Sequence, residues 1–313
     1  ILPRDLEYCD VLVATSEKMD SILRHRPEFA GEIGVVVADE VHLLDDYDRG
    51  PTLEATITKI LQINPEVQIV ALSATISNSI ELADWLNAEH IYDEWRPVPL
   101  RYGVYYDDYL WFEDGEIVEI KRDSLRIGNL VAKSIEEGGQ CIVFVSRRKS
   151  AESLAEKLAS KIYRKLSDEE REKLDKLDIP AEEESRIYWD KLRELVKKGC
   201  AFHHAGLSNM QRSFVEDSFR KGIIKCIVAT PTLAAGINLP ARYVIVRDVH
   251  RYEGGFSRMI PVLEIKQMLG RAGRPKYDKV GYGIIVASSK YKAEDYMDIY
   301  ILGEPEPLSL IHI

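Results

Sequence analysis

Short runs of apolar residues alternate along most of the chain with longer stretches whose apolar positions recur at helical spacing. The clearest run is Val35–Ala38, four small or β-branched residues that fit a strand buried on both faces of a parallel sheet. Helical spacing is clear at Ser79–Asn87 and at Tyr291–Ile301. The strands predicted this way are 10–14, 35–38, 67–72, 140–145, 200–202, 225–229, 243–246 and 281–287. The alternation predicts an α/β fold built on parallel sheets.

The alternation breaks between residues 95 and 122. Prolines punctuate 95–100, and 102–120 is rich in aromatic and acidic residues, which predicts an interdomain linker with a short β-excursion. The expected layout is therefore a first domain at 1–94, a linker at 95–122 and a second domain at 123–307. Within the second domain, 162–198 is charged and of helical period, which is typical of an inserted, solvated helical pair.

Two adjacent carboxylates, Asp39 and Glu40, follow the strand predicted at 35–38. Open α/β sheets place their ligands at the carboxyl ends of their strands. One carboxylate there can hold a divalent metal ion, while the other orients or deprotonates a water molecule. Taken alone, the pair is equally compatible with a solvated acidic turn.

Other predicted strands also end in polar residues. Thr15 or Ser16 is expected to cap a helix whose N-terminus would suit a phosphate group, although a plain cap explains the pattern as well. Ser73-Ala74-Thr75 follows the strand at 67–72. His203 and His204 are adjacent on a strand, so they are expected to point to opposite faces and to make no joint metal site.

Composition and charge narrow the class of protein only slightly. The 313 residues carry a net charge of −10, which argues mildly against a nucleic-acid partner. However, 168–184 alone holds nine acids and three bases, while basic clusters occur at 147–149 and 266–279. The four cysteines show no CxxC spacing, which predicts a cytoplasmic protein without a zinc site or disulfide framework. No apolar run is long enough for a membrane span, so no membrane partner is expected.

Five motifs in order resemble those of the superfamily 2 helicases, most closely the archaeal Ski-like DNA helicases of the Hjm type. The resemblance implies two RecA-like parallel-sheet domains, the first truncated at its N-terminus, with ATP hydrolysed between them. The motifs are Asp39-Glu-Val-His42 (Walker B), Ser73-Ala-Thr75, Phe144-Val-Ser-Arg-Arg148, Ala229-Thr-Pro-Thr-Leu-Ala-Ala-Gly-Ile-Asn238 and Gln267-Met-Leu-Gly-Arg-Ala-Gly-Arg274.

The resemblance implies a catalytic role for four of these residues. Asp39, with Glu40, would hold Mg²⁺ on the ATP phosphates, and Glu40 would orient and deprotonate the attacking water. Arg271 and Arg274 lie three residues apart, so on a helical turn they would share a face and stabilise charge on the γ-phosphate. Gly270 and Gly273 would allow close backbone approach. Further residues implied at the nucleotide are His42, Gly236, Asn238 and Gln267.

The resemblance also implies contacts with a nucleic-acid strand. Hydroxyl groups and basic side chains would grip phosphates without reading sequence, and His42 with Ser73, Ala74 and Thr75 would couple the nucleotide to the strand. The turn at Gly254-Gly255 resembles a strand-separating hairpin, in which Tyr252 and Phe256 would stack on the last base pair or pack the hairpin itself. The strand contacts implied are Thr15, Lys18, Ser146, Arg147, His204 and Thr230.

Two features depart from the family pattern. No GxxxxGK[ST] phosphate-cradling loop occurs, and the family's later winged-helix and ratchet domains have no counterpart, so a fragment of a longer helicase with weak or no ATPase activity is expected. Residues 308–313 fit the family poorly and are expected to be a non-native tail. The function expected for the parent protein is ATP-dependent 3′–5′ unwinding of single-stranded or forked DNA by a monomer, with DNA repair at stalled forks. A Ski-like RNA helicase and a non-enzymatic nucleic-acid-binding fragment remain alternatives.

Overall fold

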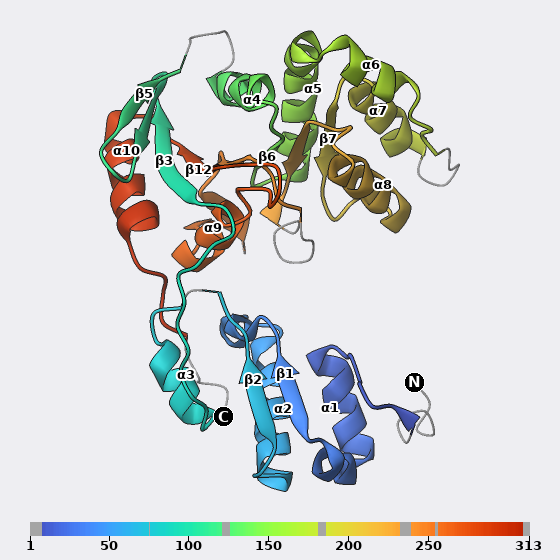
Figure 1. Cartoon of the computed structure of the whole chain (residues 1–313), viewed down its shortest axis with the longest axis vertical. Helices are drawn as coiled ribbons and strands as arrows, with labels where there is room; N and C mark the ends of the chain where they lie inside the picture. The colour runs from blue at the N-terminus through green and yellow to red at the C-terminus, as the bar shows by residue number, and fades with distance from the viewer. Residues whose placement is uncertain are drawn as a thin grey trace. The chain divides into compact units, whose positions relative to one another are not determined.

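The computed structural model divides the chain into two compact units, Ile1–Asp93 with Pro305–Ile313, and Glu94–Glu304 (Figure 1). The chain therefore passes from one unit to the other twice. We call them the first and the second unit. The residues whose structure is described are 8–74, 76–120, 126–180, 186–231, 239–253 and 256–308.

The first unit is built on two parallel strands with helices packed against them. Strand β1 (Val35–Ala38) pairs in register with β2 (Gln68–Ala71). A small core of Leu23, Ala30, Ile60 and Val67 lies under helices α1 and α2. The helical elements are α1 (Ser16–His25), η2 (Pro27–Glu32), η3 (Val41–Asp45), α2 (Gly50–Ile63) and α3 (Ser79–Trp85).

One predicted strand of the first unit does not form. Residues 11–15 have no regular structure, and the side chains of Val11 and Val13 are 79% and 90% exposed. A strand needs a neighbour that accepts and donates its backbone hydrogen bonds, and the described chain offers this segment none. The prediction of a buried strand at 10–14 is therefore wrong for the chain as it stands.

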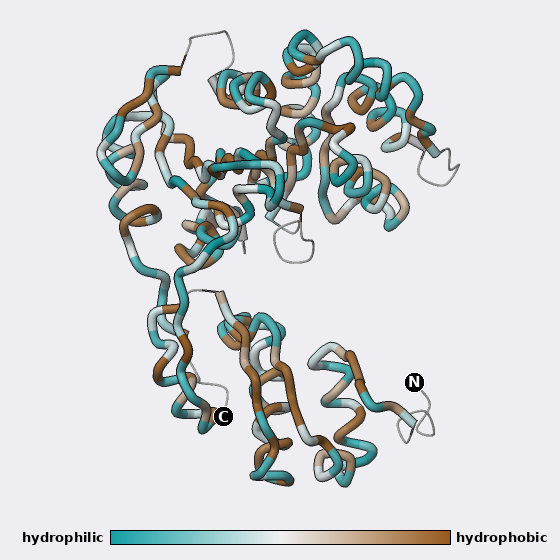
Figure 2. The backbone as a smooth tube through the Cα atoms, viewed as in Figure 1, coloured by the Kyte–Doolittle hydropathy of each residue, from teal (hydrophilic) through white to brown (hydrophobic). Residues whose placement is uncertain are grey.

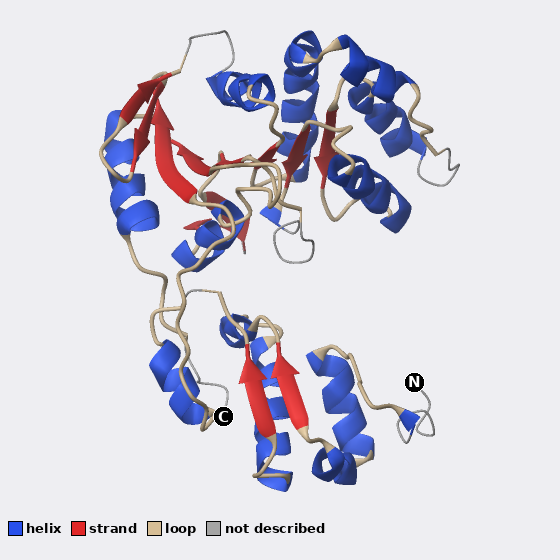
Figure 3. Cartoon of the chain, viewed as in Figure 1, coloured by secondary structure: helices blue, strands red, loops and turns tan. Residues whose placement is uncertain are grey.

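The second unit contains an eight-stranded sheet in the order β5-β4-β3-β12-β9-β6-β8-β7 (Figure 3). Every pairing from β3 to β7 along this order is parallel, and only β3-β4 and β4-β5 are antiparallel. The expected α/β fold with a mainly parallel sheet is confirmed. The strands are β3 (Leu100–Tyr106), β4 (Tyr109–Phe112), β5 (Ile117–Glu119), β6 (Cys141–Phe144), β7 (Cys200–His203), β8 (Cys226–Ala229), β9 (Tyr243–Val246) and β12 (Gly281–Val286).

Helices cover the sheet of the second unit, and a separate hairpin joins β9 to α9 (Figure 1). Its strands, β10 (His250–Glu253) and β11 (Phe256–Met259), pair antiparallel on either side of the predicted turn. The helices are α4 (Arg126–Glu136), α5 (Arg148–Lys165), α6 (Asp168–Asp175), α7 (Arg186–Val196), α8 (Asn209–Arg220), α9 (Val262–Leu269), α10 (Lys290–Tyr296) and η5 (Met297–Leu302).

The segment expected to be a linker, 95–122, instead supplies three strands to this sheet. Strand β3 pairs with β12 from Leu100 to Tyr105, and Val104 and Tyr105 on it are 0% and 1% exposed. Its aromatic and β-branched residues pack into the core because the edge of β12 is open to them. The linker interpretation is therefore corrected.

The charged segment 162–198 is helical, as predicted, but it is not simply solvated. Helix α7 buries Trp189 and Leu192, and α6 buries Leu174, against the sheet's main core. The acidic residues occupy the outer side of these helices. An amphipathic helix with one apolar stripe packs in this way, so the charge run identified only one of its two sides.

The last described residue, Leu308, packs within the first unit. Leu308 belongs to the first unit, where its backbone N–H and C=O each hydrogen-bond the Asn78 side-chain amide at 2.8 Å, while 309–313 lie outside the described residues.

Cys141, Cys200 and Cys226 are buried and unbridged on neighbouring strands. Within the described ranges, no helix combines the length and apolar character that a bilayer crossing requires.

Candidate nucleotide and nucleic-acid sites

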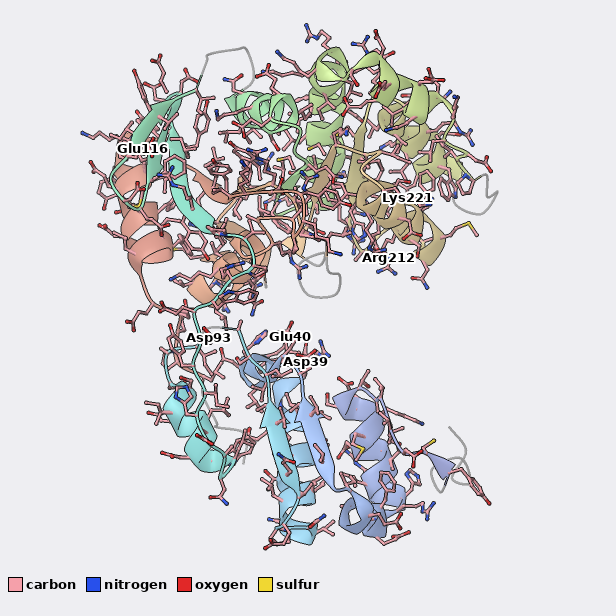
Figure 4. The ribbon with its side chains drawn as sticks, in the orientation of Figure 1. Asp39, Glu40, Asp93, Glu116, Arg212 and Lys221 are labelled. Atoms are coloured by element: carbon pink, nitrogen blue, oxygen red, sulfur yellow. The ribbon has the colours of Figure 1, made fainter. Side chains whose placement is uncertain are left out.

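Asp39 and Glu40 lie at the carboxyl end of β1, as the strand pattern predicts (Figure 4). Glu40 adopts the left-handed conformation, with φ of 54° and ψ of 44°, and its N–H donates to Asp39 Oδ1 at 2.9 Å. A glutamate is rarely found with positive φ, and such backbone strain concentrates at functional sites. The turn leaves both carboxylates exposed at the edge of the sheet.

His42 packs beneath this acidic pair. It is 7% exposed, and its Nδ1 lies 3.3 Å from Glu40 Oε2. Burial lowers the pKa of His42, and the charges of Glu40 and Asp39 offset only part of that effect. The lowered pKa favours the neutral imidazole, and its buried Nδ1 has no hydrogen-bond partner among the described residues.

The backbone ties the acidic box to the end of β2. Leu72 N–H donates to Ala38 C=O, and Val41 N–H donates to Leu72 C=O, each at 2.9 Å. Ser73 and Ala74 follow directly, so both motifs of the first unit occupy one edge of its sheet. Thr75 lies outside the described residues. The coupling role expected of the Ser73–Thr75 motif stays a prediction.

Two carboxylates are too few to enclose a metal ion by themselves. Mg²⁺ requires octahedral oxygen coordination and is commonly bound by one or two carboxylates together with phosphate oxygens and water. The exposed oxygens of Asp39 and Glu40 fit that mode. Across the described ranges, no group of three or more potential ligand residues forms a protein-only metal site.

Thr15 serves as the N-cap of α1. Its Oγ1 accepts a hydrogen bond from the Lys18 N–H at 3.3 Å. This geometry is that of an ordinary helix cap. Both side chains are exposed, so a role in binding phosphate stays a prediction.

Arg271 and Arg274 do not share a helical turn. Helix α9 contains Gln267 but ends at Leu269, and Ala272 forms an isolated bridge with Ala241. Gly273 has a φ of +92°, and a Cβ there would approach Val98 Cγ1 to 2.8 Å. The glycine spacing thus serves packing inside the second unit, and the helical-face argument for the two arginines is wrong.

Arg274 is already engaged within the second unit. Its guanidinium donates to both carboxylate oxygens of Asp278 at 2.8 Å, to Gln140 Oε1 at 3.0 Å and to Gly138 C=O at 3.3 Å. The Asp278 side chain is fully buried. A phosphate would have to compete with these bonds, so the structure favours an architectural role for Arg274. Arg271 is only partly buried.

The parallel strands of the second unit bring several predicted strand contacts to one edge. Ser146 follows β6 and Thr230 follows β8, while Arg247 and Asp248 follow β9. Ser146 and Arg147 line a pocket of about 440 Å³ with residues of the hairpin and of α10. Thr230 is only 7% exposed, and its backbone N–H donates to His203 C=O at 3.1 Å. The pocket residues are Ser146, Arg147, Ser150, Arg247, Asp248, Val249, His250, Arg251, Ser257, Val286, Ser288, Lys292 and Tyr296.

His204 is buried and cannot contact a strand through its side chain. It is 0% exposed and stacks on Phe202, with ring centroids 5.3 Å apart. Its Nδ1 accepts the Gly206 N–H at 3.1 Å, and burial lowers its pKa, with Glu152 offsetting part of the effect. The prediction of a nucleic-acid contact by His204 is therefore corrected to a packing role. His203 pairs separately with Glu216 at 2.9 Å.

The predicted hairpin is present, and one of its candidate side chains is open to solvent. Phe256 is 71% exposed, so it does not pack the hairpin. Gly254 and Gly255 lie outside the described residues, and so does the side chain of Tyr252. Gly236 and Asn238, which fall within 232–238, lie outside them too.

Comparison with known proteins agrees with this layout. Residues 2–83 match the DEAD/DEAH box helicase family, and residues 179–276 match the helicase conserved C-terminal domain. Two stretches of this chain are therefore similar to families of helicase domains. The resemblance drawn from the five motifs is thereby confirmed.

Among its relatives are archaeal proteins named ATP-dependent DNA helicase Hel308. The Methanocella arvoryzae protein is 46% identical over 303 residues, which are 96% of this chain and 41% of the relative. The Thermoplasma volcanium protein is 47% identical over 308 residues, covering 98% of this chain and 43% of the relative. The Pyrococcus horikoshii protein is 46% identical over 299 residues, covering 96% and 40%. The chain thus spans about two fifths of the length of these curated relatives.

Sequence reasoning missed part of the pocket in the second unit. Arg247 and Asp248 follow the strand predicted at 243–246, so the strand-end rule that drew attention to Asp39 and Glu40 could also have selected them. Ser288, which follows β12, and Lys292 on α10 carry no motif. Only the folded chain brings them beside Ser146.

Proposed function

We propose that the chain is the motor portion of an ATP-dependent DNA helicase. The observation that carries the proposal is the same in both units: polar residues of the helicase motifs occupy the carboxyl edge of parallel strands. The names and sequence identity of the Hel308 relatives support it. The finer expectations of 3′–5′ polarity, forked substrates, a monomer and a cytoplasmic location belong to the proposal.

The chain's own residues divide the work of hydrolysis. Asp39 would hold Mg²⁺, which supplies charge neutralisation on the phosphates when bound, and Glu40 would take the proton of the attacking water. His42, buried beneath the acidic pair, would help to couple the nucleotide to the strand. Arg271 would stabilise negative charge that develops on the γ-phosphate, while Arg274 would hold the loop that carries Arg271.

The second unit would hold the nucleic-acid strand. Ser146 and Arg147 line the 440 Å³ pocket, whose lining is rich in basic and hydroxyl side chains. Such groups contact the phosphate backbone and carry no sequence preference. Phe256, exposed on the hairpin, would stack on a base at the point of strand separation.

A domain replacement tests the catalytic part of the proposal. Residues 8–308 would replace the matching region of the Pyrococcus horikoshii relative, and DNA-stimulated ATPase activity would be measured. We expect an active chimera, and we expect Glu40→Gln to lower kcat at least about 100-fold because the general base is lost. A folded chimera that binds DNA but hydrolyses no ATP would refute the proposal. Stimulation by oligo-rU equal to that by oligo-dT would leave the DNA preference without support.

One observation favours a second candidate, a non-enzymatic nucleic-acid-binding module. The 313 residues contain no GxxxxGK[ST] loop, whose backbone and lysine cradle the phosphates. The chain alone is therefore expected to bind a single strand and to hydrolyse ATP weakly or not at all. An inactive chimera with intact strand binding would favour this module over the motor.

A further inference from the structure

Asp248 joins the ends of two neighbouring strands at the edge of the pocket. Its Oδ2 accepts the backbone N–H of Ser146 at 3.0 Å and the Ser146 hydroxyl at 3.2 Å. Its two carboxylate oxygens also accept Nε and Nη2 of Arg247, at 2.8 Å and 2.5 Å. One carboxylate thus fixes the end of β6, through Ser146, and the side chain that follows β9.

Among the described residues that line this pocket, Asp248 is the only acid. The lining includes four side chains that are cationic at neutral pH, Arg147, Arg247, Arg251 and Lys292, and four serines. Arg251 is paired with Glu264 at 2.7 Å, outside the lining. In a pocket suited to an anion, a carboxylate repels the ligand unless its charge is used to hold another group in place.

The bidentate pair with Asp248 orients the Arg247 guanidinium and uses only some of its N–H groups. Arginine has five N–H donors in a rigid fork, and Asp248 accepts two of them. The remaining N–H groups have no acceptor among the described residues, and the Arg247 side chain is 28% exposed. Those groups can therefore donate to a phosphate oxygen.

The carboxylate stays ionised at neutral pH. Burial alone would raise the pKa of Asp248, but hydrogen bonds from Arg247 and Ser146 hold it below its usual value. The Asp248 side chain is 25% exposed, so the pair is partly shielded from water. A charged, partly buried pair of this kind keeps its geometry better than a surface pair does.

We propose that Asp248 is a positioning residue that holds Arg247 and Ser146 ready for one phosphodiester group of a nucleic-acid strand. This inference rests on the proposed function of the second unit. Arg247 supplies the charge that contacts the phosphate, and Ser146 supplies the hydroxyl. Asp248 itself does not touch the ligand.

The direction in which one substitution changes the affinity for a strand distinguishes a positioning role of Asp248 from an effect of its charge alone. Asp248→Asn removes a negative charge of the pocket, which by itself would tighten the binding of an anion. Positioning predicts the opposite, because Arg247 loses its bidentate partner. With a fluorescein-labelled oligo-dT and anisotropy as the readout, we expect affinity to fall about tenfold. The plot of log K against log salt should become shallower by about 0.7, the value for one lost phosphate contact on a single strand.

Asp295→Asn is the matched control. It removes the same charge from α10 of the same unit at a residue that does not line the pocket. Its affinity should equal that of the wild type or rise slightly. Asp248→Glu, which keeps the carboxylate, should bind more tightly than Asp248→Asn.

A second variant keeps the inference testable if Asp248→Asn does not fold. Arg247→Lys keeps the positive charge but cannot make the bidentate pair. Positioning predicts that this variant binds the strand more weakly, whereas a role of charge alone predicts an unchanged affinity. Wild-type affinity in Arg247→Lys, or equal or tighter binding in Asp248→Asn, would overturn the inference while strand binding itself stands. A wild-type chain that fails to bind oligo-dT would instead overturn the proposed function of this unit, and the inference with it.

Discussion

The two sheets that contain parallel strands, one in each unit, start from the same kind of sequence and reach different degrees of burial. Every residue of β6, β7, β8 and β9 in the second unit is buried. In the first unit, Val35 and Val37 on β1 are 53% and 61% exposed, and Val70 on β2 is 37% exposed. Figure 2 shows β1 and β2 as hydrophobic along most of their length.

The difference shows that an apolar run predicts a strand more reliably than it predicts burial. Parallel strands are stable when both faces are covered, and cover comes from neighbours rather than from the strand itself. The main sheet of the second unit has eight strands, whereas the sheet of the first unit has two among the described residues. Asp39 and Glu40 are therefore held by a smaller scaffold than Ser146 and Asp248, which extend a fully buried sheet.

The largest expected effect comes from breaking the buried ion pair of the second unit. Arg274→Ala leaves the fully buried Asp278 carboxylate without its partner, which should cost about 3–5 kcal/mol of unfolding free energy. Urea unfolding followed by circular dichroism measures it. Arg49→Ala in the first unit removes an ion pair with Glu17, in which Nε and Oε1 lie 3.7 Å apart and the side chains are 46% and 52% exposed. This variant should leave the urea midpoint of unfolding unchanged. Equal losses in the two variants would break the comparison.

A matched pair of valines tests the comparison more directly. Val37 on β1 and Val228 on β8 each occupy the third position of a four-residue parallel strand and precede alanine, but Val228 is fully buried. Val228→Ala should cost about 2 kcal/mol, because it removes buried methyl groups and leaves a cavity. Val37→Ala should cost less than about 0.5 kcal/mol. The same unfolding experiment decides, and a Val37→Ala loss as large as that of Val228→Ala would mean that β1 is covered in solution.

Most strands and the motif positions could be predicted from the sequence because they depend on local patterns. Asp39, Ser73, Ser146 and Thr230 all follow strands whose apolar runs are unambiguous. What failed depended on partners distant in sequence. The strand at 10–14 lacked a neighbour, and β3 was mistaken for a linker because its partner β12 lies far along the chain.

The candidate site shows the same limit. Spacing makes Arg274 equivalent to Arg271, but the Arg274 guanidinium donates hydrogen bonds to Asp278 and Gln140. Burial of His204 could not be predicted either, since it depends on packing against Phe202 and Tyr188. Spacing predicts which residues gather at an edge, whereas their hydrogen-bond partners come from the whole fold.

Acidification should destabilise the second unit through His204. Burial lowers the pKa of His204, so the unfolded chain binds a proton that the folded chain does not as the pH falls below about 6.5. The free energy of unfolding is therefore highest above that pH. It declines as the pH falls, by about 1 kcal/mol between pH 7.5 and 5.5. His204→Asn, followed by urea unfolding across this range, should flatten the decline. An unchanged slope would show that His204 is not the group that titrates.

The smallest expected effect on stability is at an exposed aromatic residue of the well-packed unit. Phe256 on β11 is 71% exposed, so Phe256→Ala should change the unfolding free energy by less than about 0.5 kcal/mol. This would sharpen the comparison, since it would show that burial and not membership of a unit sets the cost. In the chimera with the Pyrococcus horikoshii relative, the same variant should slow strand separation while leaving DNA-stimulated ATP hydrolysis intact. A loss of stability comparable with that of Val228→Ala would mean that Phe256 packs in solution, and slower unwinding could then no longer be assigned to base stacking.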